Sequence, residues 1–233
     1  MFSSRSNLSV TEPSPLRSAP DRPIVCYVTD GHEFPPSDHQ RFLVERITAA
    51  IDAGADWIQI REKDLSAKLL LKLAREAVAI RRSARIIVNG RLDAALAAQA
   101  DGVHLGAQMI PADAVVQWRK TIPGPLEFLV GVSCHNVEAA KKAEASGADY
   151  VFFGPVFDTP AKRIFGEPQG TDRLREVCRV MSIPVLAIGG VNEANAKECL
   201  CAGAEGIAAI RLFQEGRKPA ALAQIVAHIH SLE

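Results

Sequence analysis

Polar residues that could do chemistry follow a series of short apolar runs along this sequence, at the points where the strands of a parallel sheet would end. The carboxyl ends of parallel strands meet at one edge of a sheet, or at one mouth of a barrel, so these residues are predicted to converge on one site. In chain order they are Gln59, Arg61, Lys63, Asn89, Ser133, His135, Thr159, Lys162, Gly189, Gly190, Ile210 and Arg211.

Gln59 and Arg61 alternate with two isoleucines, which places both side chains on the same face of a strand. A buried arginine requires a partner. One interpretation is a layer of salt bridges inside a barrel. The other is a clamp for an anionic or heteroaromatic ligand, with Lys63 and Lys162 adding positive charge.

The glycines of IGGV at 188–191 are predicted to open a helix and to let backbone N–H groups approach an anion. Barrels often hold phosphate after the seventh strand, which favours a phosphate site here over a simple tight turn. Ile210 and Arg211 form the companion turn after the next strand, where the guanidinium would neutralise the same phosphate or lie across the site.

His135 is the best candidate for proton transfer, because an ordinary histidine pKa lies near 6.5. A structural role is as well supported, since His135 precedes Asn136, a residue suited to cap the next helix. His104 lies between Val103 and Leu105 and is expected to be a hydrogen-bonded wall residue. Cys134 is not expected to be a nucleophile.

The elements that must position these residues are short β-branched runs that alternate with amphipathic helical segments from residue 24 onward. Helical spacing is clear at 67–82 and 136–146. Eight apolar strands in βα units predict a single TIM (β/α)8 barrel of the α/β class. The predicted strands are 24–30, 57–62, 85–89, 102–106, 128–133, 150–155, 184–190 and 206–210.

A faint internal repeat supports the same fold. AGAD at 53–56, QAD at 99–101, SGAD at 146–149 and AGAE at 202–205 each fall where a helix ends and a strand begins. Glycine there permits a left-handed helix cap, and the acid is expected to begin the turn. An open doubly wound sheet that binds a dinucleotide would instead need a GxGxxG turn after its first strand, and VTDGHEF is not one.

Composition restricts the class of protein. The chain has 233 residues, 48% of them hydrophobic, and Lys+Arg and Asp+Glu each count 27, which predicts one domain over 23–233 and a small-molecule partner rather than nucleic acid or a membrane. Residues 1–22 are predicted to be a disordered tail. Five cysteines without CxxC spacing favour a reducing cytoplasm. A homo-oligomer is compatible with the sequence.

Several motifs together resemble the thiamine phosphate synthase/TenI family. They are VTD, QIREKD, VNGRLDAALAAQADGVHLG, GVSCHNVEAAKKAEASGADYVFFGPVFDTPAK and PVLAIGGVNEANAKECLCAGAEGIAAI, in family order over roughly residues 24 to 215. The resemblance implies a TIM barrel of thiamin biosynthesis with a phosphorylated thiazole as ligand. Gln59, Arg61, Lys63, Asn89, Ser133, Thr159 and Lys162 match positions that in the synthase contact pyrimidine or pyrophosphate.

The family has two main activities. The synthase joins a pyrimidine diphosphate to thiazole phosphate, using Mg²⁺ held by an Asp after the third-strand Asn and by another in a GQED-type stretch. The TenI branch is a metal-independent thiazole tautomerase, in which a histidine matching His135 is implicated. Here Gly90 stands at the first Asp position, and Gly106, Ala107, Gln108 and Met109 stand at GQED. Glycine and methionine supply no hard oxygen ligand.

The sequence therefore predicts a thiazole tautomerase without a cofactor. In this prediction His135 moves the proton, Gly189 and Gly190 bind phosphate, and Arg61 with Lys63 or Lys162 holds the substrate carboxylate. One alternative is a thiamine phosphate synthase that recruits Mg²⁺ through Asp93 or Asp113. Another is a protein without catalytic activity that binds thiazole or thiamin phosphate in a regulatory role.

Overall fold

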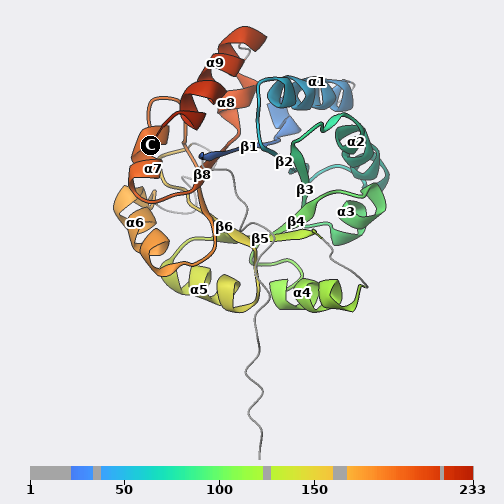
Figure 1. The fold of residues 1–233 in the computed structure, drawn as a ribbon. Helices are drawn as coiled ribbons and strands as arrows, with labels where there is room; N and C mark the ends of the chain where they lie inside the picture. Colours follow the sequence, from blue (N-terminus) through green and yellow to red (C-terminus); the bar gives the residue numbers. More distant parts are fainter. Residues whose placement is uncertain (1–21, 34–37, 123–126, 160–166, 216–217, 233) are drawn as a thin grey trace, which may run out of the picture.

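The strands form a closed parallel barrel in a computed structural model that describes residues 22–33, 38–122, 127–159, 167–215 and 218–232 (Figure 1). Each strand pairs with the next along the chain, and the eighth closes on the first. The predicted TIM barrel is therefore confirmed. The strands are β1 Ile24–Val28, β2 Trp57–Ile60, β3 Arg85–Asn89, β4 Gly102–Leu105, β5 Leu129–Cys134, β6 Tyr150–Phe153, β7 Val185–Ile188 and β8 Gly206–Ala209.

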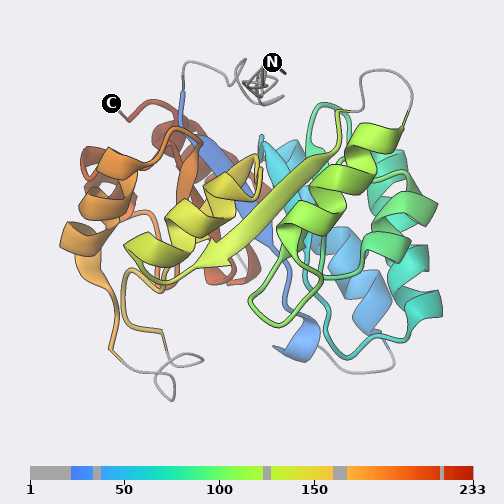
Figure 2. The same cartoon turned by 90° about the horizontal axis from the view of Figure 1, so that it is seen from below.

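Helices surround the barrel, as the two perpendicular views show (Figures 1 and 2). They follow the strands in βα order, with a 3-10 turn η1 (Gly31–Glu33) after β1 and two helices after β8. Their bounds are α1 His39–Asp52, α2 Ala67–Ile80, α3 Leu92–Ala98, α4 Ala112–Thr121, α5 Val137–Ala145, α6 Gly170–Val180, α7 Ala196–Cys201, α8 Arg211–Gln214 and α9 Pro219–His230.

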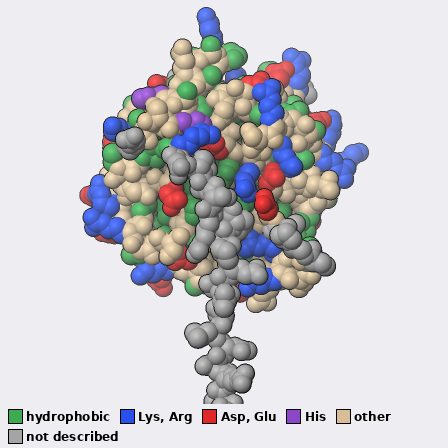
Figure 3. Space-filling view, viewed as in Figure 1, with side chains coloured by type: hydrophobic (Ala, Val, Ile, Leu, Met, Phe, Trp, Pro, Cys, Tyr) green, Lys and Arg blue, Asp and Glu red, His purple; other side chains and the backbone are tan. Residues whose placement is uncertain are grey.

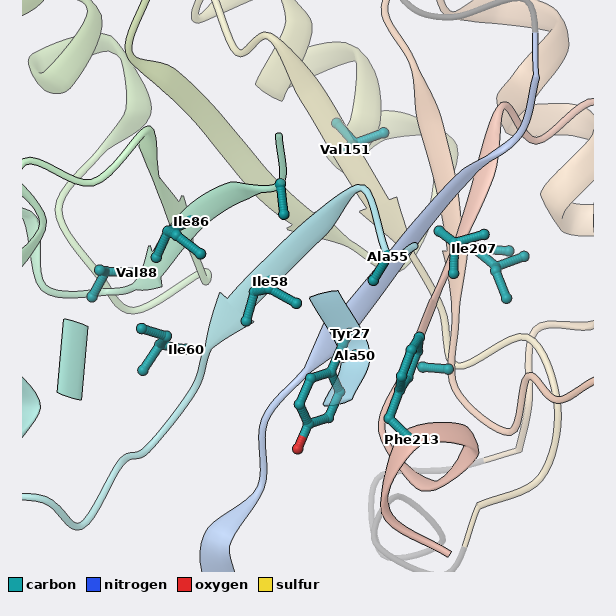
Figure 4. Packing of buried hydrophobic residues seen from close by; sticks show 14 of the residues in the cluster. Tyr27, Ala50, Ala55, Ile58, Ile60, Ile86, Val88, Val151, Ile207 and Phe213 are labelled. Carbon is teal, nitrogen blue, oxygen red and sulfur yellow. The ribbon is translucent and has the colours of Figure 1, made fainter. Parts of the chain in front are cut away.

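The larger part of the core lies between the barrel and its helices. Strand residues that face outward, such as Ile58 and Val88, are fully buried there. Figure 4 shows the rings of Tyr27 and Phe213 side by side, with centroids 4.9 Å apart. Burial of both faces explains why the strands read as continuous apolar runs.

A second apolar cluster fills the interior of the barrel, and its side chains come from alternate positions of the strands. Trp57, Leu129, Tyr150 and Phe152 belong to it. The polar residues of the interior lie nearer the carboxyl ends of β2 to β5. Packed apolar side chains thus fill the barrel interior on the amino-terminal side of these polar residues.

The GAD repeat has a structural reason. Gly54, Gly147 and Gly203 have φ between 84° and 100°, and Gln99 takes the same left-handed region at the QAD copy. The acid does more than begin the turn. Asp56 accepts a hydrogen bond from the backbone N–H of Val25, Asp101 from Ile86 and Asp149 from Val130, so each ties the start of one strand to its neighbour.

The predicted strands are all present, but most end earlier than the sequence suggests. Residues 61–62 and 154–155 belong to loops because the chain turns outward there to form the mouth of the barrel. Residues 1–21 of the predicted tail lie outside the described residues. Within the described residues, no helix is long and apolar enough to span a membrane. The face seen in Figure 3 mixes positive and negative side chains around its rim.

Candidate active site

A cavity of about 560 Å³ opens at the carboxyl ends of the strands. The structure brings ten of the twelve predicted site residues to its lining. Lys63 does not line it, since this side chain is exposed in the turn after β2, and Lys162 lies outside the described residues. The ten are Gln59, Arg61, Asn89, Ser133, His135, Thr159, Gly189, Gly190, Ile210 and Arg211.

One side of the cavity is polar and is built by four adjacent strands, β2 to β5. Gln59 is 2% exposed and donates a hydrogen bond from Nε2 to Oδ1 of Asn89 at 3.0 Å. The other amide atom of Gln59, Oε1, is buried and has no hydrogen-bond partner within the described residues. An acceptor left without a partner is a place where a ligand donor is energetically favoured.

His104 joins this polar side, which corrects its assignment as a wall residue alone. The imidazole is hydrogen-bonded as expected, with Nε2 2.8 Å from Ser133 Oγ and Nδ1 3.2 Å from the Tyr150 hydroxyl, and it also lines the cavity. Burial, assisted by the positive charge of Arg61, lowers the pKa of His104 to about 3. The ring is therefore neutral at physiological pH.

Arg61 supplies the positive charge of the polar side. Its side chain is half-buried at the end of β2, and no carboxylate of the described residues lies within ion-pair distance of its guanidinium. Glu62 next to it faces away, accepting hydrogen bonds from the Thr29 hydroxyl and the Gly31 N–H. A salt-bridge layer inside the barrel is thus absent at Arg61, and its charge is available to an anionic ligand.

His135 lies just beyond the end of β5, next to the buried Cys134. Nδ1 of His135 contacts the carbonyl oxygen of Gly154, which can only accept, so Nδ1 carries a proton, and no described residue is hydrogen-bonded to Nε2. Asn136 caps α5 by accepting from the Ala139 N–H at 2.7 Å. Burial raises the pKa of the Cys134 thiol to about 12, which agrees with its exclusion as a nucleophile.

The Gly189–Gly190 turn differs from its prediction, because α7 begins only at Ala196. The intervening turn is held by Asn195, which accepts from the Asn192 N–H and donates to the Gly190 carbonyl. Both glycines have positive φ. A Cβ at Gly189 would lie 2.5 Å from Pro155 Cα, so the chain after β6 packs directly on this turn. An anion here would meet turn N–H groups rather than a helix end.

Arg211 begins α8 directly after Ile210, and both line the cavity. The guanidinium Nη2 lies 3.5 Å from the Thr159 hydroxyl. Thr159 belongs to the loop after β6, while Gly189 and Gly190 belong to the loop after β7. Three successive loops thus surround one corner of the cavity, which carries backbone donors, a hydroxyl and a positive charge.

The residues at the magnesium positions do not suit that ion. A Cβ built on Gly90 would lie 2.7 Å from the sulfur of Met109, so a thioether fills the space of a side chain at 90. The same sulfur accepts a hydrogen bond from the Gly106 N–H. No cluster of His, Cys, Asp and Glu in the described ranges could hold a metal ion. Gly90 and Met109 therefore stand where the synthase-type site has its two carboxylates.

The two substitute carboxylates do not approach the cavity. Asp93 is bound by both Nε and Nη2 of Arg91, and this hydrogen bonding lowers its pKa to about 2. Asp113 is exposed in the first turn of α4 and accepts from the Ala114 N–H. Neither side chain lines the cavity.

Several lining residues were not among the predicted site residues. Asp30 follows β1 as the VTD motif indicates, and its backbone carbonyl accepts from Gln214 Nε2 at 2.6 Å. Strand-end position could have identified Asp30 and His104. The other lining residues gave no periodic signal; they are Asp158, Asn192 and Glu215 in loops and Gln214 at the end of α8.

Fold and cavity together define a TIM-barrel protein with a cavity at the strand ends, which has polar side chains on one side and backbone donors with a positive charge on the other. The family model described as "Thiamine monophosphate synthase" matches residues 25–213. The chain belongs to the thiamine phosphate synthase/TenI family, whose enzymes act in thiamin biosynthesis.

Individual relatives agree with this assignment. The chain is 44% identical over 185 residues to a putative thiamine-phosphate synthase of Geobacter sulfurreducens, which covers 78% of this chain and 83% of the relative. It is 48% identical over 163 residues to a thiamine-phosphate synthase of Methanocella arvoryzae, covering 69% and 74%. A solved thiamine phosphate pyrophosphorylase from Pyrococcus furiosus aligns with a TM-score of 0.72 at 31% identity, covering 88% and 96%.

Proposed function

We propose that this protein is a thiamine-phosphate synthase, which joins hydroxymethylpyrimidine diphosphate to thiazole phosphate and releases pyrophosphate. The observation that carries the proposal is the presence of two polar regions in one cavity. One region is built by β2 to β5, and the other by the turns after β7 and β8. In a closed barrel of eight strands, β3 and β4 lie opposite β7 and β8. The arrangement suits two ligands that meet in the middle.

The names of the relatives support the same choice. The tautomerase, which the sequence favoured, needs one substrate, whereas the relatives quoted above are named as synthases or as a pyrophosphorylase. A cavity of about 560 Å³ lies within the range that accommodates ligands of drug size. We therefore place the synthase first and the tautomerase second.

In the proposed reaction the thiazole nitrogen attacks the pyrimidine methylene carbon, the N–C bond forms, and the C–O bond to pyrophosphate breaks. Gln59 and Asn89 hold the polar edge of the pyrimidine. Arg61 and Ser133 bind the diphosphate, whose negative charge grows on the departing oxygen. Phe152 and Ile188 line the cavity and provide apolar contact for the rings. Fixed donors that face the developing charge lower the barrier.

The thiazole phosphate occupies the other region in this proposal. Its phosphate accepts hydrogen bonds from the turn N–H groups at Gly189 and Gly190, and Arg211 neutralises part of its charge. The route involves no metal held at the two synthase positions, because Gly90 and Met109 provide no carboxylate there. Substrate positioning and the cationic donors then contribute the main part of the acceleration.

Thiazole tautomerisation is the second candidate, and His135 is the observation that favours it. Its Nε2 has no hydrogen-bond partner among the described residues, and in the neutral imidazole it is an acceptor, as a base that removes a ring proton requires. A tautomerase has no pyrimidine substrate to bind, so this function does not explain the hydrogen-bonded pair of Gln59 and Asn89.

The experiment is to incubate purified protein with both synthase substrates and measure thiamin phosphate and pyrophosphate, with and without added Mg²⁺. We expect the two products in equal amounts and at least a tenfold lower rate for Ser133→Ala. A parallel assay follows conversion of the thiazole carboxylate tautomer. Tautomer conversion that is lost in His135→Ala, without any thiamin phosphate, would replace the synthase by the tautomerase.

A further inference from the structure

A chain of three buried polar groups leads from the barrel interior to the cavity. Tyr150 on β6 contacts Nδ1 of His104 on β4, and Nε2 of His104 contacts the hydroxyl of Ser133 on β5. Tyr150 is fully buried and does not line the cavity, whereas Ser133 does. Within the described residues, the Tyr150 hydroxyl is therefore hydrogen-bonded toward the cavity through the imidazole of His104.

The position of Tyr150 is tightly constrained. Its ring lies in the interior cluster, 4.7 Å from the Trp57 ring and 5.4 Å from the Phe152 ring between centroids. A Cβ at position 131 would lie 2.1 Å from Tyr150 Cζ, so the ring occupies space that Gly131 leaves open. The hydroxyl cannot turn to another partner by a small shift of the ring, because packed side chains surround it.

The direction of each hydrogen bond follows from counting donors. Within the described residues, the Tyr150 hydroxyl has one partner, His104 Nδ1. Burial raises the pKa of Tyr150 well above its usual value, so the phenol keeps its proton and must donate it. If Nδ1 carried a proton instead, the phenol proton would be buried without an acceptor, a penalty that shifts a tautomer ratio by about tenfold or more.

Counting donors also gives the direction of the hydrogen bond between His104 and Ser133. His104 is neutral, so it has one N–H group, and with Nδ1 accepting from Tyr150 that group is Nε2. Nε2–H then donates to Ser133 Oγ. The hydroxyl hydrogen of Ser133 takes no part in the hydrogen bonds among Tyr150, His104 and Ser133, so it can be donated to an acceptor in the cavity.

We propose that Tyr150, acting through His104, fixes the hydroxyl of Ser133 as a hydrogen-bond donor toward an anionic oxygen of the ligand. Tyr150 is thus a positioning residue that does not touch substrate. The ligand class follows from Arg61, which lines the same side of the cavity and has no ion-pair partner among the described residues. The reverse tautomer would let Ser133 donate to His104 and would present lone pairs to the ligand, which repel a phosphate oxygen.

This inference rests on the proposed function for the identity of the anion, a diphosphate, but not for the tautomer. The test therefore uses two readouts that need no turnover. The first is the nitrogen NMR spectrum of the histidine side chains in ¹⁵N-labelled wild-type protein at neutral pH. We expect His104 to show a protonated Nε2 and an unprotonated Nδ1. A protonated Nδ1 overturns the proposal without any variant.

The second readout is the affinity for inorganic pyrophosphate, measured by calorimetry. We expect Ser133→Ala to weaken binding by about tenfold or more. Tyr150→Phe keeps the ring but removes the donor, so both tautomers of His104 become populated. The affinity should then fall by about three- to tenfold. Unchanged affinity with an unchanged His104 spectrum in Tyr150→Phe overturns the proposal.

The matched control is Tyr27→Phe, the same change at the other tyrosine of the chain. The Tyr27 hydroxyl is also buried and accepts a hydrogen bond, from Gln214 Nε2 at 3.3 Å, but Tyr27 belongs to the cluster outside the barrel and is not hydrogen-bonded to His104. The Tyr27→Phe variant should leave the His104 spectrum and the pyrophosphate affinity unchanged. If both readouts behave as expected but no thiamin phosphate forms, Ser133 orientation stands and the proposed function fails.

Discussion

The sulfur of Met109 occupies the space in which a side chain at position 90 would begin, 2.7 Å from the Cβ that Gly90 lacks. The two residues therefore replace the synthase-type magnesium ligands together rather than separately. A carboxylate at 90 would have to displace the thioether, and a shorter residue at 109 would leave a gap beside Gly90.

This relationship predicts a dependence between two substitutions. Gly90→Asp should lower the free energy of unfolding by about 1–3 kcal/mol, because it collides with Met109 and holds a side chain at a φ of +71°. Met109→Ala in the same chain should recover part of the loss. Urea denaturation of both single variants and the double variant measures the coupling. Strictly additive losses would show that the two side chains do not compete.

Arg211 is predicted to determine affinity for the phosphorylated thiazole. Arg211→Ser removes a charged donor from the corner formed with Thr159, and loss of such a donor costs about 1.5–3 kcal/mol, roughly 10- to 150-fold in affinity. Calorimetry with thiazole phosphate, and with the unphosphorylated alcohol, separates this contribution. The alcohol should bind both proteins alike. Arg41→Ser, at an exposed ion pair with Glu45, serves as control. An equal loss of affinity for both ligands would indicate that Arg211 contacts the thiazole ring rather than the phosphate.

His104 is predicted to make the protein sensitive to acid. Burial lowers its folded-state pKa to about 3, whereas the unfolded chain has a value near 6.5, so the unfolded state binds more protons between these values. The contribution is fully present above pH 6.5 and is lost progressively as the pH falls toward 3. Its slope is at most about 1.4 kcal/mol per pH unit.

The check is the pH dependence of unfolding in wild type and His104→Asn. Asparagine at position 104 cannot ionise, so the stability of this variant should fall less steeply between pH 6.5 and 4 than that of wild type. His228→Asn, in the last turn of α9 and exposed, is the control and should keep the wild-type slope. Identical slopes in His104→Asn and wild type would place the sensitivity elsewhere.

Arg119 and Asp149 form a buried ion pair at the amino end of β6, where Asp149 also accepts from the Val130 N–H. Asp149 is 2% exposed, so Arg119→Leu removes the ion-pair partner of a buried carboxylate and should cost about 3–5 kcal/mol. The equivalent repeat position offers a matched control. Arg81→Leu breaks a more exposed pair with Asp101 and should cost about 1 kcal/mol or less. Equal losses in chemical denaturation would contradict the role of burial.

The barrel could be predicted from the sequence because each strand is buried on both faces and each turn carries local signals. The hydrogen bonds made by the acids of the GAD repeat could not be predicted from local sequence. Their position was clear, but the bond from Asp149 to Val130 joins neighbouring strands and depends on barrel register. Likewise, the glycines of IGGV indicated a turn, but the bonds of Asn195 delay the helix that was expected to start there.

The site was predictable where it depended on strand ends and not where it depended on side-chain direction. Arg61, one residue past the end of β2, still lines the cavity, whereas Lys63, two residues further, is exposed in the following turn. His104 looked like a wall residue because its neighbours are apolar. Its part in the site depends on Ser133 and Tyr150, which come from two other strands.

The central claim is that one cavity binds two different ligands at once. Its most direct test is calorimetric titration of thiazole phosphate into protein saturated with hydroxymethylpyrimidine monophosphate, which lacks the diphosphate leaving group. We predict a ternary complex, with the affinity for thiazole phosphate changed by less than about threefold, since separate regions bind the two ligands. Mutual exclusion, in which the pyrimidine compound raises the apparent Kd in proportion to its concentration, would contradict the two-region cavity and the synthase proposal with it.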